Sequence, residues 1–346
     1  MSSFAQRLID WHHQHGRHDL PWQHTSDPYR VWLSEIMLQQ TQVSTVIGYY
    51  ARFLARFPTL ANLAAAPIEE VMALWSGLGY YARARNLHAC ARKIVADYGG
   101  LFPQDPVVLA QLPGIGRSTA NAIAVFCFSA RAPILDGNVK RLLCRALGIE
   151  GFPGTVAIES RLWQDAAALL PEQAVATYIQ AQMDMGATLC TRGRPRCTAC
   201  PLAEQCVACQ ENRVGELPTP RPKKPLPERS VTLLVLRAGN QVLLEARPPA
   251  GIWGGLLSLP ELPMGEAVGD FCARYLGVKP HAVVPAPTFM HSFTHFRLRI
   301  QPLLCEVSAQ LQAAEARLRW VNTADLAQAA LPAPIRKILN EFSGNL

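Results

Sequence analysis

Four cysteines lie close together in one short polar segment. They are Cys190, Cys197, Cys200 and Cys206, and their spacing is C-x6-C-x2-C-x5-C. Four thiolates in one loop can enclose a tetrahedral zinc ion or a cubane iron–sulfur cluster. Zinc ribbons usually have two C-x2-C pairs separated by a longer loop, which this segment lacks. The spacing therefore predicts a metal centre, with Cys209 outside its ligand set.

A glycine-rich turn follows a short predicted helix and precedes an alanine-rich one. Its sequence is LPGIGRSTA, residues 112–120, in which Gly114 and Gly116 let the backbone turn tightly. Such a turn presents N–H groups at the start of the second helix, where a phosphate binds through the backbone and the helix dipole. The turn alone is weak evidence, but beside the four-cysteine loop it favours phosphate binding.

Two carboxylates are candidates for acid–base or electrostatic chemistry. Glu35 lies among apolar residues of the first long helix, and Asp136 precedes Gly137-Asn138 and a helix running to about Leu147. Taken alone, a helical Glu is usually a solvated charge, and an Asp at this place is a common N-cap. Their chemical role is therefore open on spacing alone.

The elements that position these residues are mostly helical. From about residue 4 to 190, apolar residues recur every three or four positions, which predicts an all-α domain. Asp27-Pro28 marks the start of a helix expected to continue through Tyr50, and Asp105-Pro106 and Leu170-Pro171 mark similar starts. Trp22 is expected to be structural. The histidines near the N-terminus are expected to be solvated; they are His12, His13, His15 and His18.

The composition changes after a proline-rich connector at 216–229. Two β-type runs, 231–236 and 242–246, surround Gly239-Asn240 and predict a hairpin. Alternation over 293–302 predicts a further strand, and helices are expected near 266–276 and 333–342. We therefore expect a helical domain at 1–215, with the cysteine loop at 190–206, and a small α+β domain at 230–346.

Together these motifs resemble the helix-hairpin-helix glycosylase superfamily of endonuclease III. The segments SEIMLQQTQV (34–43) and GLGYYARARNLH (77–88) resemble the MutY-type adenine DNA glycosylases in particular. The resemblance covers nearly the whole chain. It implies a multidomain protein, with an all-α helix-hairpin-helix domain holding one 4Fe-4S cluster and a C-terminal α+β Nudix-like domain.

The resemblance also implies roles for the two carboxylates. Glu35 matches a general acid that protonates adenine at N7, so that the base leaves as a neutral molecule. Asp136 matches a carboxylate that stabilises the oxocarbenium ion of the sugar, and Asn138 would support it. Lyase-type relatives have a lysine where this chain has Ser118, so the departure predicts a monofunctional enzyme that leaves an abasic site.

Contacts with DNA are implied at several further positions. The target adenine must be flipped out of the helix. Gln40 and Tyr80 match residues that enter the base stack, and Thr41 and Leu78 match residues near the oxidised base. Without the resemblance, Leu78 and Tyr80 are as readily explained by helix packing.

The C-terminal domain resembles the Nudix fold of 8-oxo-dGTP hydrolases through PPAGIWGGLLSLP, residues 248–260. The R-E-x-x-E-E cluster that binds magnesium in those enzymes is missing from the following segment, so hydrolase activity is not expected. Phe293, Thr294 and His295 match the family's Phe-Ser-His loop, which contacts 8-oxoguanine. Thr294 keeps the hydroxyl and adds a methyl group. The alternative is an ordinary exposed hairpin.

The expected partner is double-stranded DNA with adenine opposite 8-oxoguanine or guanine. The net charge of +7 suits a polyanion without requiring one. No membrane span or secretory signal is evident, so we expect a bacterial cytoplasmic protein, associated with the nucleoid, acting as a monomer. The competing hypotheses are a bifunctional endonuclease III-like glycosylase/AP lyase, a nucleotide pyrophosphohydrolase, and a non-catalytic DNA-binding scaffold.

Overall fold

The structure is a computed structural model that describes residues 3–222, 225–248, 251–307 and 317–343. The chain divides into two compact units: Met1–Ala65 with Asn86–Lys223, and Ala66–Arg85 with Lys224–Leu346. Residues 223–224 of the expected connector and 249–250 of the PPAGIWGG stretch lie outside the described residues. In the described ranges, no helix is both long and apolar enough to cross a membrane.

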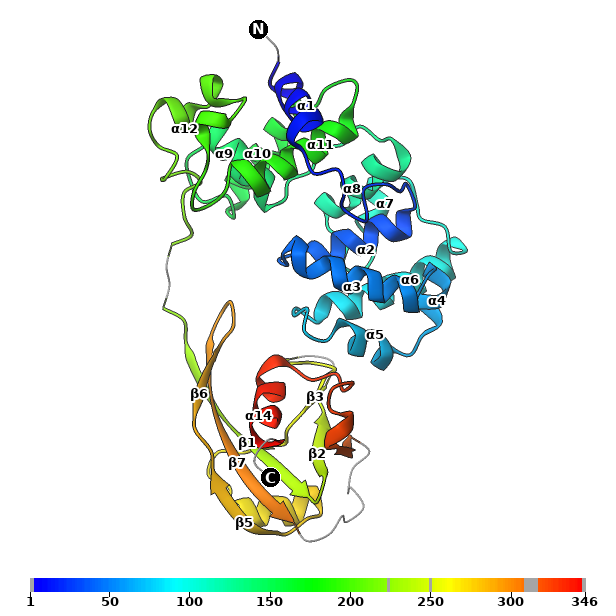
Figure 1. Cartoon of the computed structure of the whole chain (residues 1–346), viewed down its shortest axis with the longest axis vertical. Coiled ribbons are helices and arrows are strands. Elements are labelled where there is room, and N and C mark those ends of the chain that lie inside the picture. Colours follow the sequence, from blue (N-terminus) through cyan, green and yellow to red (C-terminus); the bar gives the residue numbers. More distant parts are fainter. Residues whose placement is uncertain (1–2, 223–224, 249–250, 308–316, 344–346) are drawn as a thin grey trace. The chain divides into compact units, whose positions relative to one another are not determined.

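The described residues of the first unit form helices and loops without strands, which confirms the all-α prediction (Figure 1). Its helices are α1 (Phe4–His15), α2 (Pro28–Leu38), α3 (Val43–Arg56), α4 (Leu60–Ala65), α6 (Ala82–Tyr98, which begins in the second unit), α7 (Pro106–Leu109), α8 (Arg117–Phe128), α9 (Gly137–Ala146), α10 (Val156–Ala168), α11 (Val175–Asp184) and α12 (Val207–Gln210). The π-helical turn η1 (Met185–Leu189) continues α11. The 3-10 turns η2 (Cys197–Ala199) and η3 (Ala203–Gln205) lie in the cysteine loop.

An apolar core packs α1, α9, α10 and α11 of this unit together. Leu8 of α1 packs in it with Leu143 of α9, Leu162 of α10 and Ile179 of α11, and all four are fully buried. Removing such surface from water stabilises the unit by about 25 cal/mol per Å². The packing fixes α9 and α11 relative to each other, and both contribute to the cavity described below.

Two expectations about the helices are wrong. The helix that begins at Pro28, capped by the Asp27 side chain, ends at Leu38 instead of continuing through Tyr50. Gln40 has a left-handed backbone (φ 56°), which an α-helix cannot include. Leu170-Pro171 does not start a helix, because α11 begins only at Val175.

The second unit contains a mixed sheet. Within the described residues its strands are β1 (Glu228–Ala238), β2 (Gln241–Ala246), β3 (Leu257–Ser258), β4 (Glu261–Leu262), β5 (Pro280–Pro285), β6 (Phe289–Ser292), β7 (Arg297–Val307) and β8 (Leu318–Asn322). The main order is β3-β2-β1-β7-β5, and β4, β6 and β8 pair with β1, β7 and β2, respectively. The central pair, β1 and β7, is parallel. The predicted β1–β2 hairpin is confirmed, with Ala238 opposite Gln241.

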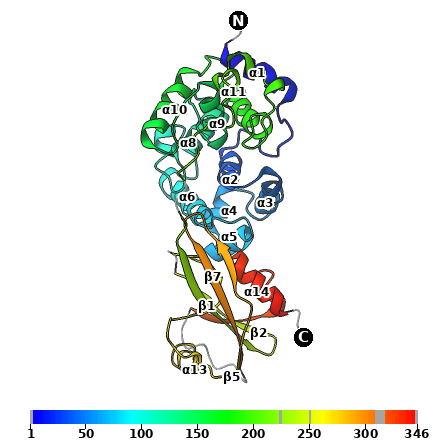
Figure 2. The same cartoon turned by 90° about the vertical axis from the view of Figure 1, so that its left-hand side faces the viewer.

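Helices cover both faces of this sheet (Figure 2). Alternate side chains of β1 point to opposite faces. Leu233 packs with Ile338 of α14 (Ala333–Ser343), whereas Leu234 packs with Phe271 of α13 (Val268–Phe271), which continues into the π-helical turn η4 (Cys272–Leu276). The predicted α+β fold and both predicted helices are confirmed. The expected strand over 293–302 is wrong at its start, because β7 begins at Arg297.

Candidate active site

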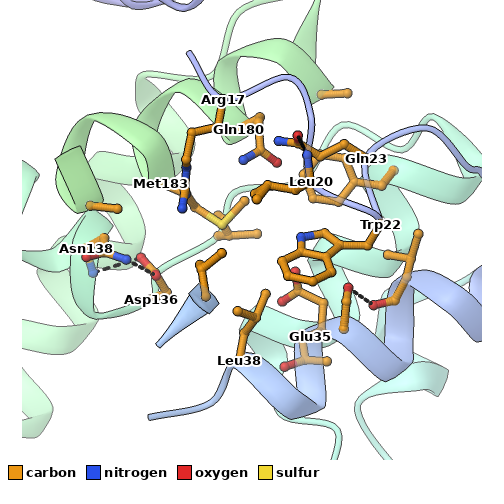
Figure 3. Close-up of a pocket in the computed structure, with 18 of the residues that line it drawn as sticks. Arg17, Leu20, Trp22, Gln23, Glu35, Leu38, Asp136, Asn138, Gln180 and Met183 are labelled. Atoms are coloured by element: carbon orange, nitrogen blue, oxygen red, sulfur yellow. Dashed lines mark hydrogen bonds between the residues drawn. The ribbon is translucent and has the colours of Figure 1, made fainter. Parts of the chain in front are cut away.

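A cavity of about 830 Å³ lies in the first unit. Glu35 of α2 and Asp136 at the N-terminus of α9 both line it, although they are about a hundred residues apart in sequence (Figure 3). Ser118 and Asn138, two more of the predicted site residues, line it too. The fold therefore brings the two predicted catalytic carboxylates to one cavity.

Burial controls the charge of Glu35. Its neighbours in α2, Ser34 and Ile36, are buried, and the buried Trp22 lines the same cavity (Figure 3). Burial, together with a smaller contribution from the nearby charge of Asp136, raises the pKa of Glu35 from 4.5 to about 7. A substantial fraction of Glu35 therefore carries a proton near neutral pH.

Three hydrogen bonds hold the Asp136 carboxylate in place. Its Oδ1 accepts from the backbone N–H groups of Asn138 (2.9 Å) and Val139 (2.7 Å), so that it caps α9. Its Oδ2 accepts from the Asn138 side chain at 3.0 Å. Burial raises the pKa of Asp136, and these hydrogen bonds oppose that rise by favouring the carboxylate. The N-cap and a chemical role are thus compatible.

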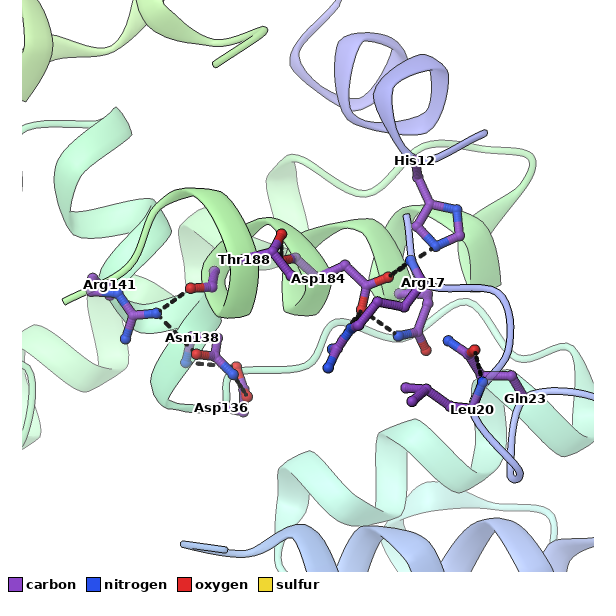
Figure 4. A network of polar contacts seen from close by, with 11 residues as sticks. His12, Arg17, Leu20, Gln23, Asp136, Asn138, Arg141, Asp184 and Thr188 are labelled. Atoms are coloured by element: carbon purple, nitrogen blue, oxygen red, sulfur yellow. Dashed lines mark hydrogen bonds and ion pairs between the residues drawn. The ribbon is translucent and has the colours of Figure 1, made fainter. Parts of the chain in front are cut away.

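Arg141 connects this site to the cysteine loop. Figure 4 shows Arg141 beside Asn138. Its Nη2 donates to Asn138 Oδ1 at 2.9 Å and to the carbonyl of Gly186 at 2.6 Å, while its Nε donates to the carbonyl of Cys190 at 2.8 Å. One guanidinium therefore links the amide that contacts Asp136 to the first cysteine of the loop.

The opposite wall of the cavity contains residues that the sequence interpretation missed. Arg17 and Gln180 line it, and both donate to Asp184, a carboxylate with no solvent exposure. Arg17 reaches Oδ1 through Nη2 at 2.6 Å, and Gln180 through Nε2 at 2.9 Å. Burial would raise the pKa of Asp184, but hydrogen bonding from His12 and the charge of Arg17 hold it below its usual value.

The structure also bears on the expectations for His12 and Trp22 in the N-terminal segment. His12 is buried, with Nε2 3.3 Å from Asp184, so the prediction of a solvated histidine is wrong there. Trp22 is buried as a structural residue would be, with its ring 5.4 Å from that of Tyr50, and it also forms part of the cavity wall.

The glycine-rich turn joins α7 to α8 as predicted. Gly114 has a positive φ of 75°, and a Cβ there would lie 2.7 Å from the Asn86 side chain, so the close approach requires glycine. Gly116 is exposed and precedes the first residue of α8. The Ser118 hydroxyl accepts from the backbone N–H of Leu135 at 2.9 Å, which fixes the segment leading to Asp136.

The interruption between α2 and α3 presents Gln40 and Thr41. Both line the cavity, and Gln40 is exposed. The Thr41 backbone N–H donates to the Leu38 carbonyl at 3.3 Å, which closes the turn. The turn therefore projects polar side chains at the rim of the cavity that holds Glu35.

The four predicted cysteine ligands line one small cavity together with Cys209. In the described part of the chain, no three His, Cys, Asp or Glu side chains converge closely enough to hold a single metal ion. Arg145 is buried, and its Nη1 lies 3.3 Å from the Cys190 sulfur, where it can balance thiolate charge. The donor set, four thiols with an adjacent cation, fits a cluster bound by cysteine.

Leu78 and Tyr80 belong to the second unit, in the turn between α5 (Ile68–Trp75) and α6. Leu78 is buried, whereas Tyr80 is about half exposed and has a left-handed backbone (φ 50°). The guanidinium of Arg83 donates to the carbonyls of Leu78 (3.3 Å) and Gly79 (3.1 Å). The turn thus presents one exposed aromatic ring on a fixed backbone.

Phe293, Thr294 and His295 connect β6 to β7. The Phe293 ring stacks on Phe296 with centroids 4.4 Å apart, and the Phe293 N–H donates to the Phe296 carbonyl. Thr294 and His295 are exposed, and Thr294 Oγ1 lies 3.3 Å from His295 Nδ1. The loop therefore has an aromatic anchor and an exposed polar tip.

Comparison with known families matches each half of the chain. Residues 33–167 match the HhH-GPD superfamily of base excision DNA repair proteins, and residues 231–341 match the NUDIX domain. A thermostable thymine-DNA glycosylase is 27% identical, with a TM-score of 0.56 over 60% of this chain and 95% of that one. Endonuclease III in a non-covalent DNA complex shares the fold, with a TM-score of 0.52 and 22% identity over 60% of this chain and 94% of that chain. The chain is a DNA N-glycosylase of base excision repair with a Nudix domain at its C-terminal end.

The relatives identify the family. The adenine DNA glycosylase of Buchnera aphidicola subsp. Acyrthosiphon pisum is 36% identical over 99% of this chain and 98% of its own length. The Homo sapiens adenine DNA glycosylase is 32% identical over 99% of this chain and 74% of its own. The chain belongs to the adenine DNA glycosylase family.

Proposed function

We propose that this protein hydrolyses the N-glycosidic bond of adenine paired with 8-oxoguanine or guanine in duplex DNA. The observation that carries the proposal is the pair formed by Glu35 and Asp136 at one cavity. Burial raises the pKa of both groups, but that of Glu35 reaches about 7, whereas Asp136 accepts three hydrogen bonds that oppose its rise. Such a difference assigns a proton donor and an anion to a pair of carboxyl groups.

Glu35 supplies the proton in this proposal. Adenine leaves its sugar poorly as an anion, and protonation at N7 turns it into a neutral leaving group. A carboxyl group with a pKa near 7 keeps that proton available at neutral pH. After the base has left, the Glu35 carboxylate can accept a proton from the attacking water.

Asp136 stabilises the positive charge that develops on the sugar. The N–H groups of Asn138 and Val139 hold its carboxylate in place before the reaction, so no reorganisation is needed as the charge forms. The Asn138 side chain keeps Oδ2 oriented. Water then adds to the sugar carbon, and the product is an abasic site.

The wall formed by Arg17 and Gln180 suits the edge of the flipped base. Because Gln180 uses its Nε2 to bind Asp184, its Oε1 remains to accept a hydrogen bond. Arg17 is a donor. Adenine presents an amino donor beside a ring-nitrogen acceptor, whereas guanine reverses this order, so one acceptor and one donor favour adenine.

The chemistry at Ser118 supports a monofunctional reaction. A hydroxyl that accepts from the Leu135 N–H cannot replace an amine in Schiff-base formation with the sugar. We therefore expect no borohydride-trappable adduct, and strand cleavage only after alkali. If an adduct were trapped, it would favour the alternative function, a bifunctional glycosylase/AP lyase.

One 4Fe-4S cluster is proposed on Cys190, Cys197, Cys200 and Cys206. When bound, it would cross-link the loop and supply a one-electron redox centre. For DNA contact we propose Gly114 and Gly116 at a phosphate, and Gln40 and Tyr80 in the base stack. Thr41, Leu78 and the loop of Phe293, Thr294 and His295 would contact the base opposite adenine.

A single-turnover assay tests these assignments. Duplexes would carry adenine opposite 8-oxoguanine, guanine or thymine, and strands would be analysed with and without alkali. We expect alkali-dependent cleavage at adenine, fastest opposite 8-oxoguanine, and a loss of at least about a hundredfold in Glu35→Gln. The exposed Glu69 of α5 provides the matched control, Glu69→Gln. Undiminished rates in Glu35→Gln would remove Glu35 as the acid.

A further inference from the structure

The turn that carries Leu78 and Tyr80 is bound to residues near the C-terminus of the chain. Two hydroxyl groups flank the turn, one on each side. Ser76 Oγ donates to the Leu331 carbonyl at 3.4 Å, and the Tyr81 hydroxyl donates to the same carbonyl at 3.3 Å. A single backbone oxygen therefore ties both ends of the turn.

Arg336 of α14 holds that arrangement together. Its Nη2 donates to Ser76 Oγ at 3.1 Å and to the Ala329 carbonyl at 2.9 Å, while its Nη1 donates to the Leu326 carbonyl at 3.0 Å. The same guanidinium thus fixes the loop that leads to Leu331 and contacts the hydroxyl at the edge of the turn. Charge-assisted hydrogen bonds of this kind are stronger than neutral ones.

The turn needs such support because one of its residues is strained. Gly77 (φ 93°) and Gly79 (φ 75°) adopt positive φ without a steric penalty, but Tyr80 (φ 50°) has a side chain that disfavours this region. A strained backbone conformation persists only where contacts with the surrounding structure hold it in place. Trp75 Nε1 donates to the Gly79 carbonyl at 3.2 Å from within the segment, and the contacts from Leu331 and Arg336 act from outside it.

We propose that Arg336 is a positioning residue: by holding the turn that carries Leu78 and Tyr80, it contributes to the preference for 8-oxoguanine over guanine. The inference rests on the proposed function, in which this turn and the Phe293–His295 loop both contact the base opposite adenine. Guanine and 8-oxoguanine differ only at C8 and N7. Small displacements of the contacting groups therefore decide the discrimination. Arg336 sets the position of the turn relative to the domain that carries the loop.

Single-turnover rates on A:8-oxoguanine and A:guanine duplexes test this in full-length protein. The variants are Arg336→Met, Ser76→Ala and their combination. The control is Lys337→Met, which removes a charge from an exposed neighbour on α14 that pairs with Glu341. We expect each single variant to lose about tenfold on A:8-oxoguanine, since each removes the hydrogen bond from the Arg336 guanidinium to Ser76. The rate on A:guanine should stay within about twofold, and the double variant should lose no more than the worse single variant.

Other outcomes are distinguishable. If the variants lose equally on both duplexes, or lose nothing on either, the ratio of the two rates is unchanged and the proposal is overturned. Arg336 also holds three carbonyls of its own domain, so Ser76→Ala gives the decisive result if Arg336→Met does not fold. Failure of the proposed function is seen in the wild-type protein alone, which would then release no adenine or would show no preference for 8-oxoguanine over guanine.

Discussion

The Asn138 side chain donates a hydrogen bond to Asp136 Oδ2 at 3.0 Å, and its own oxygen accepts from Arg141 at 2.9 Å. Asn138 therefore has its amide orientation fixed by a cation on one side and a carboxylate on the other. Rotation of the amide by 180° would place oxygen against oxygen at Asp136.

This geometry predicts the effect of Asn138→Ala. The Asp136 carboxylate would lose one of its three hydrogen bonds, and a bond to a charged group is worth about 1.5–3 kcal/mol. We expect the single-turnover rate of adenine release to fall by about tenfold to a hundredfold. Lys140→Met, a change in the same helix at a residue that pairs with Glu159, is the control. A wild-type rate in Asn138→Ala would show that Asp136 is oriented by the backbone alone.

The pKa of Glu35 predicts how the rate depends on pH. If Glu35 is the proton donor, the rate of adenine release follows its protonated fraction. With the pKa raised to about 7 by burial, the rate should be nearly constant below that pH and should fall as pH rises through it. Single-turnover rates between pH 5.5 and 9 measure this profile. A rate that increases over the same range would contradict the assignment.

The same shift predicts how the stability depends on pH. Because the folded-state pKa lies above 4.5, ionisation costs the native protein more than the unfolded chain. The free energy of unfolding contributed by Glu35 is therefore greatest below pH 4.5 and declines up to about pH 7, by at most about 1.4 kcal/mol per pH unit. Glu35→Gln should be more stable than wild type at pH 8, with a smaller difference at pH 5. Thermal denaturation at the two pH values provides the comparison, and equal differences would exclude this charge effect.

The cysteine loop predicts different results for neighbouring cysteines. Cys200→Ser should lose iron and the brown colour, because it removes one of four proposed ligands. Cys209→Ser should keep both, although Cys209 lines the same cavity. Iron and sulfide analysis with visible absorption spectra distinguishes the two. Loss of iron in Cys209→Ser would show that the proposed ligand set is wrong. One zinc ion per wild-type chain would show that the proposed metal is wrong.

The sequence allowed prediction of features with strong local signals. Gly114 needs its left-handed conformation, and Asp136 is followed by residues that form a capped helix, so both were predictable. The break at Gln40 was not, because glutamine gives no sign of a positive φ, and the apolar pattern continues across it. Contacts between distant segments were also missed. Arg17 and Gln180 meet at Asp184 only through the packing of α1 against α11, which no spacing in the sequence reveals.

The contacts of Ser76 have a consequence for biosynthesis. Two of the hydrogen-bond partners of its side chain, Leu331 and Arg336, follow it by 255 and 260 residues. During translation, the segment 66–85 emerges early, yet the groups that hold it are among the last to leave the ribosome. A nascent chain therefore keeps this segment without its final contacts until synthesis is nearly complete. Premature termination anywhere before residue 331 removes those contacts, even when every residue of the helical unit is present.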